Sequence, residues 1–343
     1  MTRGTRTIVG AVVALAIVAG VGWLIFGGGS DGPVVNVYSA RSHYGTEAVF
    51  DRFTEETGIK VEIYGGEPGP LVDRITAEGE RTKADLLITT DAGFLWKAAE
   101  DGLLAPVKSA ALEKAVPANL RDPQDRWFAI AERARTIMRS TERVPEAQAP
   151  ATYAALGDAR WKGKLCLRTS NNVYNQSLVA TLIADRGEDA ARTILESWMA
   201  NDPIILGADT EVLDAIKAGR CDVGLTNTYY LGNKLKDDPS FPVAPVWAEQ
   251  GSGGTHVNVS GVGLTTAASA HKADAIKLME YLLTPEAQRL IAEGNSEFPV
   301  LKGVQEAEWI RGWGDFTADA RPIVRAGEYQ AQAVQLMNAV GWK

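Results

Sequence analysis

The sequence predicts an α/β protein made of two doubly wound lobes, which are joined by a hinge that the chain crosses twice. Its 343 residues are too many for one ordinary domain and suit two. Strand and helix patterns alternate after residue 33, which is typical of a doubly wound sheet. The alternation restarts after a stretch containing Pro145 and Pro150, so a second α/β unit is expected there.

In the first unit, short apolar runs alternate with helical patterns. Val49, Phe50 and Phe53 mark one face of a helix that Gly58 ends, and Pro70 suits the first turn of the next helix. The expected strands lie at 34–38, 60–64 and 84–89, and the expected helices at 46–57, 70–79 and around Leu95 and Ala98.

The second unit repeats this pattern. Strands are expected to begin at Cys166 and Cys221, and helices are expected at 174–184, 189–199 and 209–218. Further along the chain, helices are expected at 272–283 and 285–293. The extended segments 134–139 and 257–262 are the candidate crossings between the lobes. The expected division is 1–33 for an export segment with its linker, 34–134 and 260–300 for lobe 1, 135–259 for lobe 2, and 301–343 for a C-terminal helical segment.

The N-terminal segment predicts export. Arg3 and Arg6 precede an uninterrupted apolar run from 8 to 26, and a flexible stretch rich in glycine follows it. The run is long enough to cross a bilayer and has no convincing cleavage site, so a cleaved signal and a retained membrane anchor both stay open. We expect a periplasmic or cell-envelope protein that touches the membrane only through this segment.

Composition and motifs narrow the class of function. The net charge of −8 argues against nucleic acid as a partner, because nucleic acids are bound by basic surfaces. The chain has only three histidines and lacks the Gly-x-Ser-x-Gly, His-Glu-x-x-His and P-loop motifs, so we expect no enzyme. We expect a monomer.

The chain has two cysteines, Cys166 and Cys221, and each stands at the start of an expected strand. Outside the cytosol a single pair of cysteines favours a disulfide. Neighbouring parallel strands would bring the two positions together. Two free buried thiols are the alternative.

Tyrosines close three of the loops that follow expected strands: Tyr44 after the strand at 34–38, Tyr174 after the strand that begins at Cys166, and the pair Tyr229 and Tyr230 after the strand that begins at Cys221. Ligands of doubly wound sheets bind beyond the carboxyl ends of the strands. Phenolate oxygens suit a hard, highly charged cation that can displace their protons, and Fe³⁺ is the biological ion acidic enough to do so. The alternative for Tyr229 and Tyr230 is an ordinary first helical turn with one buried ring.

Several short motifs occur together in one order and spacing, and they cover nearly all of the chain from residue 34. They are Asn-Val-Tyr-Ser-Ala-Arg at 36–41, His-Tyr at 43–44, Thr-Asp-Ala-Gly at 90–93, Arg-Ala-Arg at 133–135, Tyr-Asn-Gln-Ser at 174–177, Thr-Asn-Thr-Tyr-Tyr at 226–230 and Gly-Thr-His-Val-Asn-Val-Ser-Gly at 254–261. In these motifs the chain resembles the periplasmic ferric-iron-binding proteins of ABC importers, in particular their tyrosine-rich subclass. The resemblance implies the type II periplasmic binding protein fold and delivery of Fe³⁺ to the permease subunits of an ABC importer.

The resemblance also implies a set of metal ligands. It places Tyr44 on the first lobe and Tyr174, Tyr229 and Tyr230 on the second. A second subclass uses a histidine at the position of His43, but Ser42 is an extra residue before it, so the role of His43 stays open.

The resemblance places an arginine of the first crossing near the metal, where it would offset the excess charge of four phenolates over a 3+ ion. Alternation along a strand puts Arg133 and Arg135 on the same face, so both are candidates, and surface salt bridges are the alternative for both. The strongest rival function is the same fold with another solute, namely a polyamine, a thiamine-like cation or a small oxyanion. An amine would require carboxylates and stacking aromatic rings, whereas the loops offer mainly hydroxyls, amides and phenols.

Overall fold

The computed structural model describes residues 32–41, 47–268 and 270–343. The expected export segment and the two candidate ligands His43 and Tyr44 lie outside these residues. Within the described ranges, each helix is too short or too polar to cross a bilayer.

The described strands form one mixed sheet whose order is β2-β1-β3-β10-β5-β8-β6-β7, with β4 beside β10 and β9 beside β5. The strands are β1 Val34–Ser39, β2 Lys60–Gly65, β3 Leu86–Thr89, β4 Leu104–Ala105, β5 Trp127–Ser140, β6 Leu165–Arg168, β7 Ile204–Leu206, β8 Val223–Asn227, β9 Val243–Val246 and β10 Val257–Thr265. The outer strands β1, β2 and β3 pair in parallel, as do β6, β7 and β8, while β5 and β10 are antiparallel to their neighbours. Two parallel units are therefore connected by an antiparallel pair.

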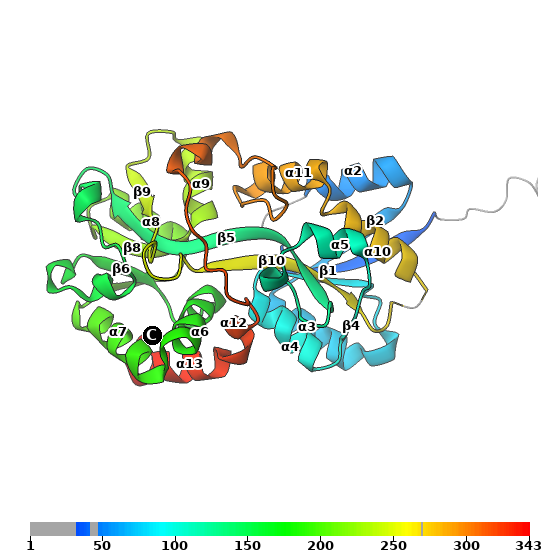
Figure 1. Ribbon diagram of the computed structural model, residues 1–343, viewed down its shortest axis with the longest axis horizontal. Coiled ribbons are helices and arrows are strands. Elements are labelled where there is room, and N and C mark those ends of the chain that lie inside the picture. Colours follow the sequence, from blue (N-terminus) through cyan, green and yellow to red (C-terminus); the bar gives the residue numbers. More distant parts are fainter. Residues whose placement is uncertain (1–31, 42–46, 269) are drawn as a thin grey trace, which may run out of the picture.

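Helices cover both faces of this sheet (Figure 1). They are α2 Ala48–Thr57, α3 Pro68–Glu78, α4 Ala92–Glu100, α5 Ala110–Ala115, α6 Val173–Arg186, α7 Glu188–Ala200, α8 Asp209–Lys217, α9 Thr228–Asp237, α10 Lys272–Tyr281, α11 Pro285–Asn295, α12 Arg325–Glu328 and α13 Gln330–Ala339. Gly58 ends α2 in the left-handed conformation at φ 71°, which glycine adopts without steric penalty.

The hydrophobic core is divided into two halves. The first half packs around β1, β2 and β3, and its buried side chains come from 35–134 and 257–324. The second half packs around β6, β7 and β8, and its buried side chains come from 137–248 and from the C-terminal residues 333–342. The C-terminal segment thus contributes to both cores.

The strands β5 and β10 run side by side between the two halves (Figure 1). β5 pairs with β10 as far as Ala134 and with β8 from Arg135 onward. One strand therefore belongs to both halves, and its neighbour changes in the middle. This geometry suits a hinge, because both strands pass from one half to the other side by side.

The predicted α/β fold with two parallel units is confirmed. Some strand boundaries differ from the prediction: β3 begins at Leu86 and not at residue 84, β6 begins at Leu165 and not at Cys166, and β8 begins at Val223 and not at Cys221. Cys221 precedes the strand, and a disulfide joins it to Cys166 of the parallel neighbour β6, with the two Cα atoms 5.9 Å apart. The bond connects positions 55 residues apart and lies away from the tyrosines, at the opposite end of these strands.

Candidate metal centre

Two helices that begin at the carboxyl ends of parallel strands carry three of the candidate tyrosines. Tyr174 lies in the first turn of α6 after β6, and Asn172 caps that helix by accepting a hydrogen bond from the Tyr174 amide. Tyr229 and Tyr230 lie in the first turn of α9, directly after β8. Because β6 and β8 are parallel neighbours, their carboxyl ends meet at one edge of the sheet.

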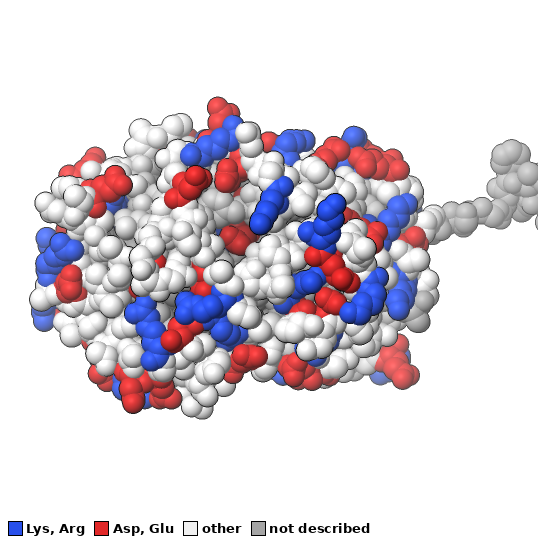
Figure 2. All heavy atoms as spheres, in the orientation of Figure 1, with Lys and Arg blue, Asp and Glu red and all other residues white. Residues whose placement is uncertain are grey.

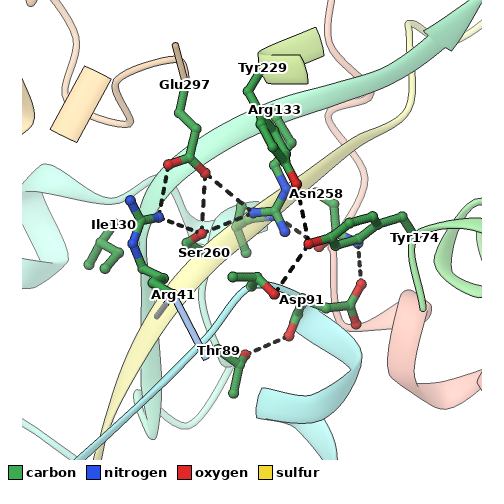
Figure 3. Close-up of polar contacts among 12 residues, drawn as sticks. Arg41, Thr89, Asp91, Ile130, Arg133, Tyr174, Tyr229, Asn258, Ser260 and Glu297 are labelled. Carbon is green, nitrogen blue, oxygen red and sulfur yellow. Dashed lines mark hydrogen bonds and ion pairs between the residues drawn. The ribbon is translucent and has the colours of Figure 1, made fainter. Parts of the chain in front are cut away.

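The tyrosine hydroxyls converge. The hydroxyl oxygens of Tyr174 and Tyr229 are 3.4 Å apart, and the ring centres of Tyr229 and Tyr230 are 4.1 Å apart. Figure 3 marks the contact between the hydroxyls of Tyr174 and Tyr229. The described residues contain no group of three or more histidine, cysteine, aspartate or glutamate side chains that could hold a metal. Phenol oxygens are therefore the metal donors that this part of the chain brings together.

Burial keeps the phenol of Tyr230 protonated in the absence of a metal. Tyr174 and Tyr229 are buried, and Tyr230 is half-buried. Burial, together with the nearby Tyr174 and Asp209, raises the pKa of Tyr230 to about 12, whereas Arg168 opposes the rise. A cation that binds here must displace this proton, which only a strongly acidic metal ion does near neutral pH.

Arg168 is a functional candidate that the sequence analysis missed. It is the last residue of β6, hydrogen bonds to Tyr230 and lies 3.7 Å from Asp209. With Tyr174 and Tyr230 it lines a cleft of about 510 Å³. Its place at the end of a strand, six residues before Tyr174, is the signal that could have identified it.

The two arginines of the first crossing face different surroundings. The guanidinium carbon of Arg133 lies 5.5 Å from the ring centre of Tyr174. Arg135 is hydrogen bonded to Asn175 and to Asp209 within the second half. The change of strand partner between Ala134 and Arg135 explains the difference, so Arg133 is the arginine beside the tyrosines.

The first half meets the tyrosines through Thr90, which follows β3. The Thr90 hydroxyl lies 3.4 Å from the Tyr174 hydroxyl. Behind this contact, a buried cluster joins Arg41, Arg133, Ser260 and Glu297 (Figure 3). The tyrosines therefore lie between the two halves, next to a buried set of paired charges.

A model of a known protein family matches residues 81–309, and its description is bacterial extracellular solute-binding protein. The chain belongs to this family. The solute-binding protein is 40% identical to "Iron uptake protein A2" and 39% identical to "Iron uptake protein A1", both of Synechocystis. The first alignment covers 90% of both chains, and the second covers 90% of this chain and 87% of the relative.

Solved structures of iron-binding proteins share the fold of this chain. This solute-binding protein superposes with a TM-score of 0.85 and 40% identity on the Trichodesmium protein described as in complex with iron and citrate ligands, over 90% of this chain and all of that one. It also superposes on the ferric binding protein from Campylobacter jejuni with a TM-score of 0.83 and 32% identity, over 90% of this chain and all of that one. The fold predicted for type II periplasmic binding proteins is thereby confirmed.

The donor set fits a ferric ion. Two phenolates with oxygens 3.4 Å apart would repel each other unless a cation lay between them. Three phenolates supply three negative charges, which match Fe³⁺, and hard oxygen donors are the ligands that such an ion prefers. The arrangement can bind a cation.

Proposed function

We propose that this protein captures ferric iron between its two halves, outside the cytoplasm, and delivers it to the permease subunits of an ABC importer. The observation that carries the proposal is the convergence of Tyr174, Tyr229 and Tyr230 at one edge of the sheet. The relatives named for iron uptake and the solved neighbours with iron support the same cargo. The protein acts as a carrier, and no catalytic step is part of the proposal.

The ligand set we propose contains Tyr44 in addition to the three tyrosines of the second half. Tyr44 follows β1, whose carboxyl end lies beside that of β3 because the two strands are parallel neighbours. Thr90, which follows β3, contacts Tyr174. A ligand from the loop after β1 would complete a shell to which both halves contribute. We keep His43 as a further candidate ligand and Arg133 as the cation that offsets the excess negative charge.

The two halves would move as lobes about β5 and β10. Lobe 1 comprises 34–134 and 260–300, and lobe 2 comprises 135–259, with 301–343 following as a C-terminal segment. Because each lobe supplies ligands, iron binding would favour the closed arrangement, and opening would release the ion to the importer.

The protein surface is compatible with a small inorganic cargo. On the face drawn in Figure 2, basic and acidic side chains are interspersed over both halves. A mixed surface on a chain of net charge −8 does not attract polyanions such as nucleic acid. We propose a monomer that is exported by its N-terminal segment and is held at the membrane by that segment where it is not cleaved.

Metal analysis after dialysis against chelated ferric iron tests the proposal. The wild-type protein is expected to retain one iron per chain, and the Tyr230→Phe variant is expected to retain far less. A protein that retains no iron but binds a polyamine, a thiamine-like cation or a small oxyanion in calorimetry would contradict the proposal.

A further inference from the structure

A buried polar contact joins the two halves behind the tyrosines. Asp91 lies two residues after β3 in the first half and caps α4, where its Oδ1 accepts a hydrogen bond from the Gly93 amide at 2.7 Å. Ser177 lies in α6 of the second half, three residues after Tyr174. Both Asp91 and Ser177 are fully buried.

The second carboxylate oxygen of Asp91 receives two short hydrogen bonds. The Ser177 hydroxyl donates to Asp91 Oδ2 at 2.6 Å, and the Asn258 side-chain amide donates to the same oxygen at 2.6 Å. Figure 3 shows the contact between Asn258 and Asp91, close to Tyr174. Hydrogen bonds to an ionised carboxylate are stronger than those between neutral groups.

Asp91 accepts hydrogen bonds from Gly93, Asn258 and Ser177. Gly93 belongs to the first half and Asn258 to the crossing strand β10, and both are fixed in position. Asn258 in β10 accepts hydrogen bonds from the amides of Ala92 and Val259, at 3.1 and 2.8 Å, so its side-chain amide points at Asp91. Among the residues that the structure describes, Ser177 is the donor to Asp91 that comes from the second half. Relative motion of the halves therefore acts on the contact between Ser177 and Asp91.

We propose that Ser177 and Asp91 form a latch, which holds the two lobes closed and sets how long the cargo is retained. The proposal rests on the proposed function for the identity of the cargo. Ser177 and Asp91 touch no ligand and act as positioning residues.

The physical reason is the cost of a buried carboxylate. Burial raises the pKa of Asp91, and the Ser177 hydroxyl is the largest of the contacts that oppose the rise. Without that hydroxyl, the closed form holds a buried charge with one donor fewer, while the open form can replace the donor with water. Loss of a hydrogen bond to a charged group is expected to shift the equilibrium between the closed and open forms by about 10- to 100-fold toward the open form.

The latch also fixes a tyrosine. Residues three apart on a helix lie on the same face, so Ser177 and Tyr174 both face the first half. Their partners, Asp91 and Thr90, are adjacent in the chain. A closed latch therefore holds the Tyr174 hydroxyl at the edge of the first half, where the proposed cargo binds.

The Ser177→Ala variant of the full chain tests the latch, with Ser197→Ala as the matched control. Ser197 donates a hydrogen bond to the Ile194 carbonyl within its own helix, so its loss leaves the contact between the halves intact. Release of ferric iron to a competing chelator should be about 10-fold or more faster in Ser177→Ala than in the control. The association rate should be unchanged, since binding begins in the open form.

A measurement on the iron-free protein tests the latch independently of the identity of the cargo. Small-angle scattering of the iron-free protein should show a larger radius of gyration for Ser177→Ala than for wild type and Ser197→Ala. If the wild-type protein binds no iron, the proposed function fails and the scattering comparison alone decides the latch. The latch is refuted if Ser177→Ala matches the control in both the scattering profile and the release rate.

A double-mutant cycle attributes the effect to the pair. Asp91→Asn keeps the Oδ1 acceptor for the Gly93 amide and replaces the oxygen that receives Ser177 and Asn258. In the latch, the combined Asp91→Asn and Ser177→Ala variant releases iron about as fast as the faster single variant. Effects that multiply would mean that the two residues act independently, which would overturn the latch.

Discussion

The hydroxyl oxygens of Tyr174 and Tyr229 lie 3.4 Å apart, although the two residues belong to different helices and are 55 positions apart in the chain. Each residue sits in the first turn of a helix that follows a parallel strand, and the two strands are neighbours. The pairing of β6 and β8 thus creates a pair of phenols that only a bound cation allows to ionise together.

Phenylalanine substitutions should separate metal binding from folding. Tyr174→Phe, Tyr229→Phe or Tyr230→Phe removes one donor oxygen and keeps the ring. Each should weaken ferric binding by more than about 100-fold, since loss of a partner that only supports a ligand already costs about 10–100-fold. The free energy of unfolding of the iron-free protein should fall by only about 0.5–1.5 kcal/mol, the worth of one hydrogen bond.

Tyr64→Phe is the control for these variants. Tyr64 lies in β2 and donates a hydrogen bond to Glu62 at the protein surface, away from the cleft. Its loss should leave ferric affinity unchanged in chelator competition. Equal losses of affinity in Tyr64→Phe and Tyr230→Phe would contradict the assignment of the ligands.

The pH at which iron is released should depend on Arg168. Burial raises the pKa of Tyr230 to about 12 and Arg168 opposes the rise, so protons compete with the metal and occupancy falls as the pH falls. Arg168→Gln removes the opposing charge and favours the protonated phenol. The midpoint of iron loading in a pH titration should therefore move to higher pH, and a midpoint that stays in place would show that Arg168 does not assist Tyr230.

The sequence alone predicted that three tyrosines lie at one edge of the sheet, but it did not predict which side chains surround them. The rule that ligands bind beyond strand ends depends only on the order of strands, so it placed Tyr174, Tyr229 and Tyr230 at one edge of the sheet, where the structure brings them together. Their role as ligands stays a prediction. Alternation along a strand could not separate Arg133 from Arg135, because the partner of β5 changes from β10 to β8 between them.

Partners that are distant in the chain could not be predicted either. The contact of Asp91 with Ser177 spans 86 positions and depends on how the two halves pack. No local periodicity encodes that packing. The boundary of β8 was misplaced by two residues for a related reason, since Cys221 is as apolar as the strand but lies before its pairing begins.

His256 should make the iron-free protein less stable in acid. Burial lowers the pKa of His256 to about 3, and the Nδ1 atom lies 3.0 Å from the Thr181 hydroxyl. The depressed pKa means that the neutral side chain supports folding above about pH 6.5, and that this support is lost as the pH falls toward 3.

His256→Asn removes the titrating group. Wild type should be the more stable protein at pH 7.5, and its advantage in unfolding free energy should shrink by about 3 kcal/mol at pH 4. Urea unfolding at the two pH values measures this difference. An advantage that is the same at both values would show that His256 does not titrate in this range.

The disulfide should be present in the exported protein and should stabilise the second half. Thiol counting on the denatured, unreduced protein should find no free thiol. Replacing both Cys166 and Cys221 by serine opens a loop of 55 residues and should cost about 4 kcal/mol of unfolding free energy. Iron affinity should change little, because the bond lies at the far end of the strands that carry the tyrosines. Two free thiols in wild type would contradict the expectation.

The visible absorption spectrum of the wild-type protein with chelated ferric iron tests the central claim most directly. Coordination of Fe³⁺ by phenolates gives an orange-red charge-transfer band, which complexes of a polyamine or an oxyanion lack. We predict that the band appears on loading, disappears on acidification, and is shifted or lost in Tyr229→Phe and Tyr230→Phe but not in Tyr64→Phe. A wild-type protein that stays colourless with excess chelated ferric iron would contradict the claim that its tyrosines hold iron.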